Sequence, residues 1–179
     1  MHGTIALAAA AFLAAPAAAH ADALYYVDVS VRKSVVVETA CPDGSRHFDE
    51  TSHIWRGSGS GRLPGSAGIV AITHTLLTAK AHFPEDGEPV EDVDREKLDG
   101  GDYALRRIAR YKAGRIVLDL GRMSPVKRKL RVRAPGPESE VDLDRPGKEK
   151  RKQGEKDANG CTPTTIRATD ITGSVQRLR

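Results

Sequence analysis

The chain has 179 residues, 39% of them hydrophobic, and its 28 Lys or Arg against 24 Asp or Glu give a formal net charge of +4. This length suits one domain or two very small ones. The mild positive charge does not by itself indicate a nucleic-acid-binding protein, and we expect no nucleic-acid partner.

The first 23 residues form a short apolar run that is dominated by alanine and ends in overlapping Ala-x-Ala sites. Such a run is typical of a secretory signal peptide and is too short and too rich in alanine for a membrane span. Cleavage is predicted after Ala19, Ala21 or Ala23, and residues 24–179 would then form the mature domain. We therefore predict a periplasmic or secreted protein that meets the membrane through its leader, before cleavage.

Residues 25–32 alternate between apolar and polar side chains, with Val27, Val29 and Val31 on one face. This period of two predicts a half-buried strand. A second β-branched run at residues 35–39 predicts a second, separate strand.

The chain contains two cysteines, Cys41 and Cys161. In an exported chain an even pair of cysteines most simply forms a disulfide. We predict that bond, and two free thiols are the alternative.

Residues 46–68 are polar and rich in glycine, and they contain Trp55 and the run Gly-Ser-Gly-Ser-Gly at residues 57–61. This composition predicts a flexible surface loop. Phosphate binding is disfavoured, because the run lacks the lysine and the following helix of a P-loop.

Residues 69–77 are an aliphatic and β-branched run, which predicts a buried strand that leads to His82. Residues 84–102 then carry nine acidic side chains. We expect a solvated loop there, with at most one helical turn at residues 93–98. Calcium binding is a weaker alternative, because the acidic spacing fits no EF-hand.

Residues 103–111 and 115–120 are separated by a turn at Ala113 and Gly114, which predicts a hairpin. Residues 129–133 alternate between basic and apolar side chains and predict a strand with one wet face.

Residues 134–160 are mostly polar or charged and predict a mobile charged loop, which could attract an anionic envelope surface. Residues 165–167 and 171–178 are expected to add one or two short strands. Seven to nine strands with little helix indicate an all-β domain.

Two motifs resemble those of trypsin-like (chymotrypsin-fold) serine proteases. Residues 77–82, Leu-Thr-Ala-Lys-Ala-His, resemble the family's Leu-Thr-Ala-Ala-His with one added residue, and residues 102–105, Asp-Tyr-Ala-Leu, resemble Asp-x-Ala-Leu. The Gly-Ser-Gly element at residues 57–61 also lies where the family often has one. The resemblance implies a chymotrypsin-like barrel, with a second barrel that this chain can complete only in part.

The resemblance implies that His82 is the catalytic base and that Asp102 is the carboxylate that orients it. Ser174, which follows Gly173, is the candidate nucleophile, although the family's Gly-Asp-Ser-Gly-Gly motif is absent. We predict an exported serine endopeptidase, or its inactive descendant, that acts on protein or peptide and uses no cofactor. The alternative is a non-catalytic, disulfide-pinned β domain that binds an envelope partner.

Residues 47–53 hold two imidazoles, His47 and His53, and two carboxylates, which are side chains that suit zinc or copper. Their spacing matches no strict motif, so we predict no metal site. Cleavage after Ala19 would place His20 at the new N-terminus, where its amine and imidazole could chelate copper.

Overall fold

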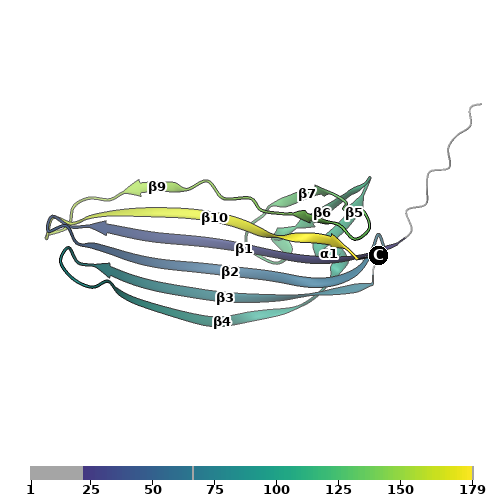
Figure 1. Ribbon diagram of the computed structural model, residues 1–179, viewed down its shortest axis with the longest axis horizontal. Helices are drawn as coiled ribbons and strands as arrows, with labels where there is room; N and C mark the ends of the chain where they lie inside the picture. The colour runs from purple at the N-terminus through teal and green to yellow at the C-terminus, as the bar shows by residue number, and fades with distance from the viewer. Residues whose placement is uncertain (1–21, 66, 179) are drawn as a thin grey trace, which may run out of the picture.

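The computed structural model describes residues 22–65 and 67–178, which form two antiparallel β-sheets (Figure 1). One sheet has seven strands and the other three. The all-β prediction is confirmed. None of the helices among the described residues is long and apolar enough to cross a membrane.

The large sheet is built mainly from long strands. These are β1 (Ala23–Ala40), β2 (Arg46–Leu63), β3 (Gly68–Phe83), β4 (Val90–Ala104) and β10 (Thr162–Arg177). The short strands β8 (Glu140–Asp142) and β9 (Lys150–Gln153) both pair with β10. The order β4-β3-β2-β1-β10-β8 describes an open sheet, so the predicted chymotrypsin-like barrel is not confirmed.

The small sheet consists of β5 (Ala109–Lys112), β6 (Arg115–Asp119) and β7 (Lys129–Arg133). The predicted hairpin is confirmed for β5 and β6, which pair across Ala113 and Gly114, both at positive φ. Helix α1 (Leu105–Ile108) connects β4 to β5, and the 3-10 helix η1 (Leu120–Arg122) follows β6.

The small sheet and its two helical turns cover one face of the large sheet near one end (Figure 1). We call this region the body; it comprises residues 105–133 and the part of the large sheet that they cover. Val27, Val29 and Val31 of β1 are fully buried there, as their alternation predicts. The other fully buried side chains of the core include Leu105, Ile108, Ile116, Leu118, Leu120, Leu143, Ile171 and Val175.

Beyond the body, the large sheet continues as a single layer that we call the blade, residues 33–54, 74–98, 150–153 and 162–169 (Figure 1). Within these described residues no apolar side chain is fully buried. At the blade's far end, Cys41 follows β1 and Cys161 precedes β10, and the predicted disulfide joins them.

Two segments that we predicted as loops are strands in the structure. Residues 46–63 form β2, in which glycine alternates with serine so that Gly57 and Gly61 are buried beneath the body. A hypothetical Cβ on Gly57 would lie 3.1 Å from Met123 Cε, and one on Gly61 would lie 2.8 Å from Leu105 Cδ2. Glycine is therefore needed for close packing here rather than for flexibility.

The acidic segment is also a strand, because residues 90–104 pair with β3 as the edge strand β4. Charged side chains are well tolerated at a sheet edge, where both faces meet water. The predicted mobile loop at residues 134–160 contains the strands β8 and β9. The two short strands predicted at residues 25–32 and 35–39 are one long strand, β1, and those predicted at residues 165–167 and 171–178 are one long strand, β10.

The predicted leader lies outside the described residues, apart from its last two positions. Ala23, one of the three predicted cleavage positions, is the first residue of β1 and is 5% exposed. Asp22 accepts a hydrogen bond from the backbone N–H of Gly65 at 3.0 Å. Asp22 and Ala23 are therefore part of the folded domain.

Candidate functional site

The structure does not bring His82 and Asp102 together. His82 lies near the blade end of β3, whereas Asp102 lies in β4 opposite Ala71 of β3. Eleven residues of extended chain separate Ala71 from His82, which corresponds to about 36 Å. Because 71 and 82 differ by an odd number, the two side chains also project from opposite faces of the sheet.

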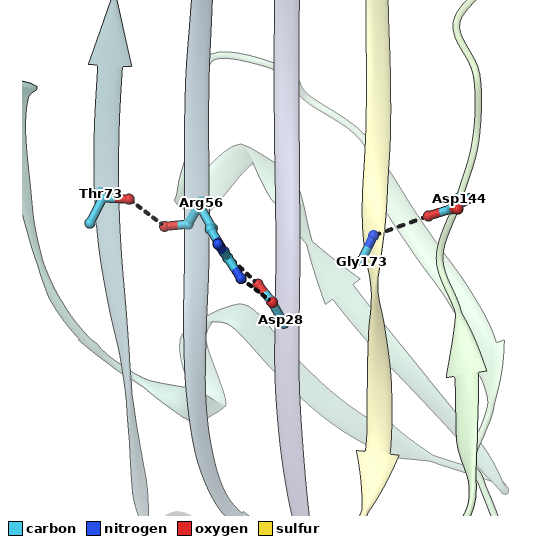
Figure 2. A network of polar contacts seen from close by, with 5 residues as sticks. All are labelled: Asp28, Arg56, Thr73, Asp144 and Gly173. Carbon is cyan, nitrogen blue, oxygen red and sulfur yellow. Dashed lines mark hydrogen bonds and ion pairs between the residues drawn. The ribbon is translucent and has the colours of Figure 1, made fainter. Parts of the chain in front are cut away.

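Ser174 lies in the body, opposite Asp28 of the neighbouring strand β1. Asp28 is paired with Arg56, whose Nε lies 3.0 Å from Asp28 Oδ1 and whose Nη2 lies 2.6 Å from Oδ2 (Figure 2). The preceding residue of β10, Gly173, donates its N–H to Asp144 Oδ1 at 3.1 Å. The surroundings of Ser174 therefore supply an ion pair and no imidazole, and the three predicted catalytic residues do not assemble.

Histidines of β2 and β3 pair on one face of the blade. His47 lies opposite His82, with stacked rings and the two Nδ1 atoms 3.0 Å apart. Nearer the body, His53 Nδ1 lies 3.0 Å from His74 Nε2. Each contact can share one proton between two neutral rings, and protonation of both rings in a pair would set like charges against each other.

Trp55 lies at the end of this histidine face that is nearest the body. Its ring stacks on His74 at 4.7 Å between centroids, and on His53 at 5.6 Å. Burial and the neighbouring His53 both lower the pKa of His74 from its ordinary value of 6.5. The neutral form of His74 is therefore favoured in the folded chain.

This shift predicts an acid-sensitive blade. Because the folded pKa of His74 lies below 6.5, the unfolded chain binds more protons, and the free energy of unfolding falls as pH falls through 6.5. We expect urea midpoints of the wild type to fall more between pH 7.5 and pH 5.5 than those of His74→Gln. Equal losses in the two proteins would contradict this assignment.

The two histidines of residues 47–53 do not contact each other. His47 and His53 are on the same strand but contact different partners, His82 and His74. No group of three or more His, Cys, Asp or Glu in the described part of the chain is arranged to hold a metal ion. His20 lies outside that part.

The opposite face of the blade carries a row of aromatic and aliphatic side chains among charged ones such as Arg95 and Lys97, and we call it the apolar face. Phe48 and Phe83 meet edge to face with centroids 5.4 Å apart, and together with Arg46 and Ala81 they line a shallow hollow of about 490 Å³. The alternation of the strands places the following side chains on this apolar face: Val36, Phe48, Ile54, Leu77, Ala79, Ala81, Phe83, Val93 and Ile166. Val93 is 54% exposed, and the others are partly exposed.

A polar cluster lies at the centre of this apolar face. Ser52 is fully buried and donates to Glu50 at 2.6 Å, while Arg32 contacts both residues. Burial alone would raise the pKa of Glu50, but the hydrogen bonds from Ser52 and Arg32 outweigh it and lower that pKa. The carboxylate therefore stays charged and fixes Arg32 across β1 and β2.

An open hollow of about 850 Å³ lies at the tip of the blade, beside the disulfide. His47 and His82 line it together with the acidic side chains Asp43, Glu85 and Asp86. Hydrogen bonds from Ser45 lower the pKa of Asp43. The tip is thus polar and acidic, in contrast to the apolar face.

No protein-family model matches the chain, and no protein of established function and no solved structure is significantly similar to it. The function of the protein is therefore inferred from the geometry of its surface.

Sequence reasoning missed the apolar face, although Ile54 and Phe48 occupy even-numbered positions of β2 and so share a face. The glycines and charges of residues 46–63 obscured that alternation.

Proposed function

We propose that the protein is a non-catalytic, disulfide-pinned binding module of the periplasm or cell exterior, and that its apolar blade face binds an envelope protein. The observation that carries the proposal is a row of partly exposed apolar side chains on a sheet with no second layer. Contiguous apolar patches of this kind mark interaction sites in soluble proteins.

The energetics support a binding role for this face. The body has its own core, centred on side chains such as Leu118 and Val29, which are fully buried without any contribution from the blade's apolar face. Most side chains of that face are only half-buried, so part of their apolar surface still meets water after folding. Each Å² that a partner covers would contribute roughly 25 cal/mol, before the cost of association.

A proteolytic function is not supported in the same way. General-base catalysis needs the base within hydrogen-bond reach of its nucleophile and of the carboxylate that orients it. His82, Asp102 and Ser174 lie far from one another along their strands. The separation of these three residues therefore does not fit the serine-protease mechanism that the resemblance implies.

Site-specific photo-crosslinking in the producing cells tests the proposal. Ala79 projects from the apolar face, and its neighbour Thr78 projects from the histidine face of the same strand. A photoreactive residue at position 79 is expected to give an adduct with a defined envelope protein, which mass spectrometry identifies. The same residue at position 78 is the matched control and is expected to give no such adduct.

Two further measurements sharpen this experiment. Leu77→Lys in the apolar face is expected to abolish the adduct at position 79 while circular dichroism shows a folded chain. A fluorophosphonate probe is expected to leave the purified protein unlabelled. Equal adducts from both faces, or labelling that is lost on Ser174→Ala, would refute the proposal.

A further inference from the structure

The two outer edges of the blade are unpaired and opposite in charge. Strand β4 pairs only with β3, and β9 pairs only with β10, among the described strands. The acidic edge is the stretch of β4 at residues 91–96, Glu-Asp-Val-Asp-Arg-Glu. The basic edge is β9, Lys-Arg-Lys-Gln, and every residue of both stretches is exposed.

Two lysines of the basic edge and two aspartates of the acidic edge project from the same face of the sheet. In the strand register, Lys152 of β9 and Asp92 of β4 end the same row of directly opposed residues, which runs through Thr165, Val37, Asp49 and Lys80. Lys150 and Asp94 end the next row on that face. Neither the two lysines nor the two aspartates form an ion pair among the described residues.

Strand direction and hydrogen-bond alternation also agree. Six strands cross the blade at this level, from β9 through β10, β1, β2 and β3 to β4, and each pair is antiparallel. The two edge strands therefore run in opposite directions. In antiparallel sheets the residues that bond to one neighbour alternate with those that bond to the other. Across six strands, the backbone N–H and C=O groups of Asp92 and Lys152 therefore either both point out of the sheet or both point into it. The two edges can thus continue the same antiparallel hydrogen-bond pattern.

We infer that a second copy of this chain adds to the sheet, with the acidic edge of one copy pairing antiparallel to the basic edge of the next. Asp92 then faces Lys152, and Asp94 faces Lys150, as cross-strand ion pairs. Pairing of two acidic edges or of two basic edges is disfavoured by like charges. The contact joins two different surfaces, so it repeats and builds an open filament rather than a closed dimer. It uses the edges and does not depend on what binds the apolar face.

A charge swap tests this inference on the full mature chain. The first variant carries Asp92→Lys with Asp94→Lys, and the second carries Lys150→Glu with Lys152→Glu. In low salt, sedimentation velocity of the wild type is expected to show species larger than a dimer that grow with concentration. Each variant alone is expected to associate at least roughly tenfold more weakly, because its two edges then carry like charge.

An equimolar mixture of the two variants is expected to assemble again, because each edge then meets its opposite charge on the other variant. Salt near 1 M, where the Debye length is about 3 Å, is expected to weaken assembly of the wild type and of the mixture alike. Arg131→Glu with Arg133→Glu, on exposed positions of β7, is the control with the same charge change as the second variant and is expected to assemble like the wild type.

A wild type that stays monomeric would overturn the inference, as would variants that assemble like the wild type or a folded mixture that stays dispersed. Assembly that resists the charge swap but disappears with Leu77→Lys would assign self-association to the apolar face instead. Should a double variant fail to fold by circular dichroism, the single changes Asp92→Lys and Lys152→Glu provide the same swap with one ion pair.

Discussion

Replacing both cysteines, Cys41→Ala with Cys161→Ala, is expected to lower the free energy of unfolding by roughly 5 kcal/mol. The bond joins positions 120 residues apart, so its loss frees a long loop in the unfolded chain. A domain of this size has a total stability of about 5–15 kcal/mol. Urea unfolding at equilibrium, followed by circular dichroism, should therefore show a protein that has lost a third or more of a total in this range.

The same experiment has a local readout. The disulfide holds the ends of β1 and β10 at the tip of the blade, far from the core. Amide exchange is expected to accelerate most at Val37 and Glu38, near the tip, and least at Val27 and Val29. Reduction of the wild-type bond should reproduce both effects. A loss of stability under about 1 kcal/mol would contradict the expectation from chain entropy.

Adding one methyl group at Gly61 is expected to destabilise the fold strongly. In Gly61→Ala the new Cβ would lie 2.8 Å from Leu105 Cδ2 and 2.7 Å from Gly68 Cα, and it would also overlap the carbonyl oxygen of Ala67. Backbone rather than a flexible side chain must move. We expect a loss of about 3 kcal/mol, measured as a lower urea midpoint with an unchanged m-value.

Ser60→Ala provides the matched control, because Ser60 is adjacent in the chain and exposed on the other side of the strand. Its effect is expected to stay within about 0.5 kcal/mol. Gly57→Ala should lie between the two, since its nearest neighbour is the flexible end of Met123. Equal effects of the changes at Gly61 and Ser60 would show that the alternating glycines are not needed for close packing of the body against β2.

Much of the fold follows from the period of two in the sequence. Val27, Val29 and Val31 predict a buried strand face, and Leu130 with Val132 predicts a strand with one wet face; both are confirmed. The disulfide was likewise predictable, because a chain with two cysteines can form one intramolecular disulfide, and the predicted Cys41–Cys161 bond is present.

The lengths of the strands could not be predicted from local composition. Strand β4 is rich in acidic residues, and it is extended because β3 offers it a paired edge, not because its residues prefer strands. The glycines of β2 follow the same principle, since tertiary contact with Leu105 decides their role.

The candidate site was the least predictable part of the protein. His82 and Asp102 resemble a motif in sequence, but a motif fixes function only where the fold brings its residues together. Here the long hairpins carry them to different ends of β3 and β4. The apolar face, in contrast, combines side chains from five strands, and no single stretch of sequence reveals it.

The central position of β1 beside β10 also has a consequence for the timing of folding. Tyr25 pairs with Arg177, so strands from the two ends of the described chain form the middle of the sheet. While the chain is synthesised from its N-terminus, β1 can pair with β2 but not yet with β10. Sheets built on such distant contacts fold slowly and expose unpaired strands meanwhile. We therefore expect the last segment, β10, to close the sheet after every other strand has been made.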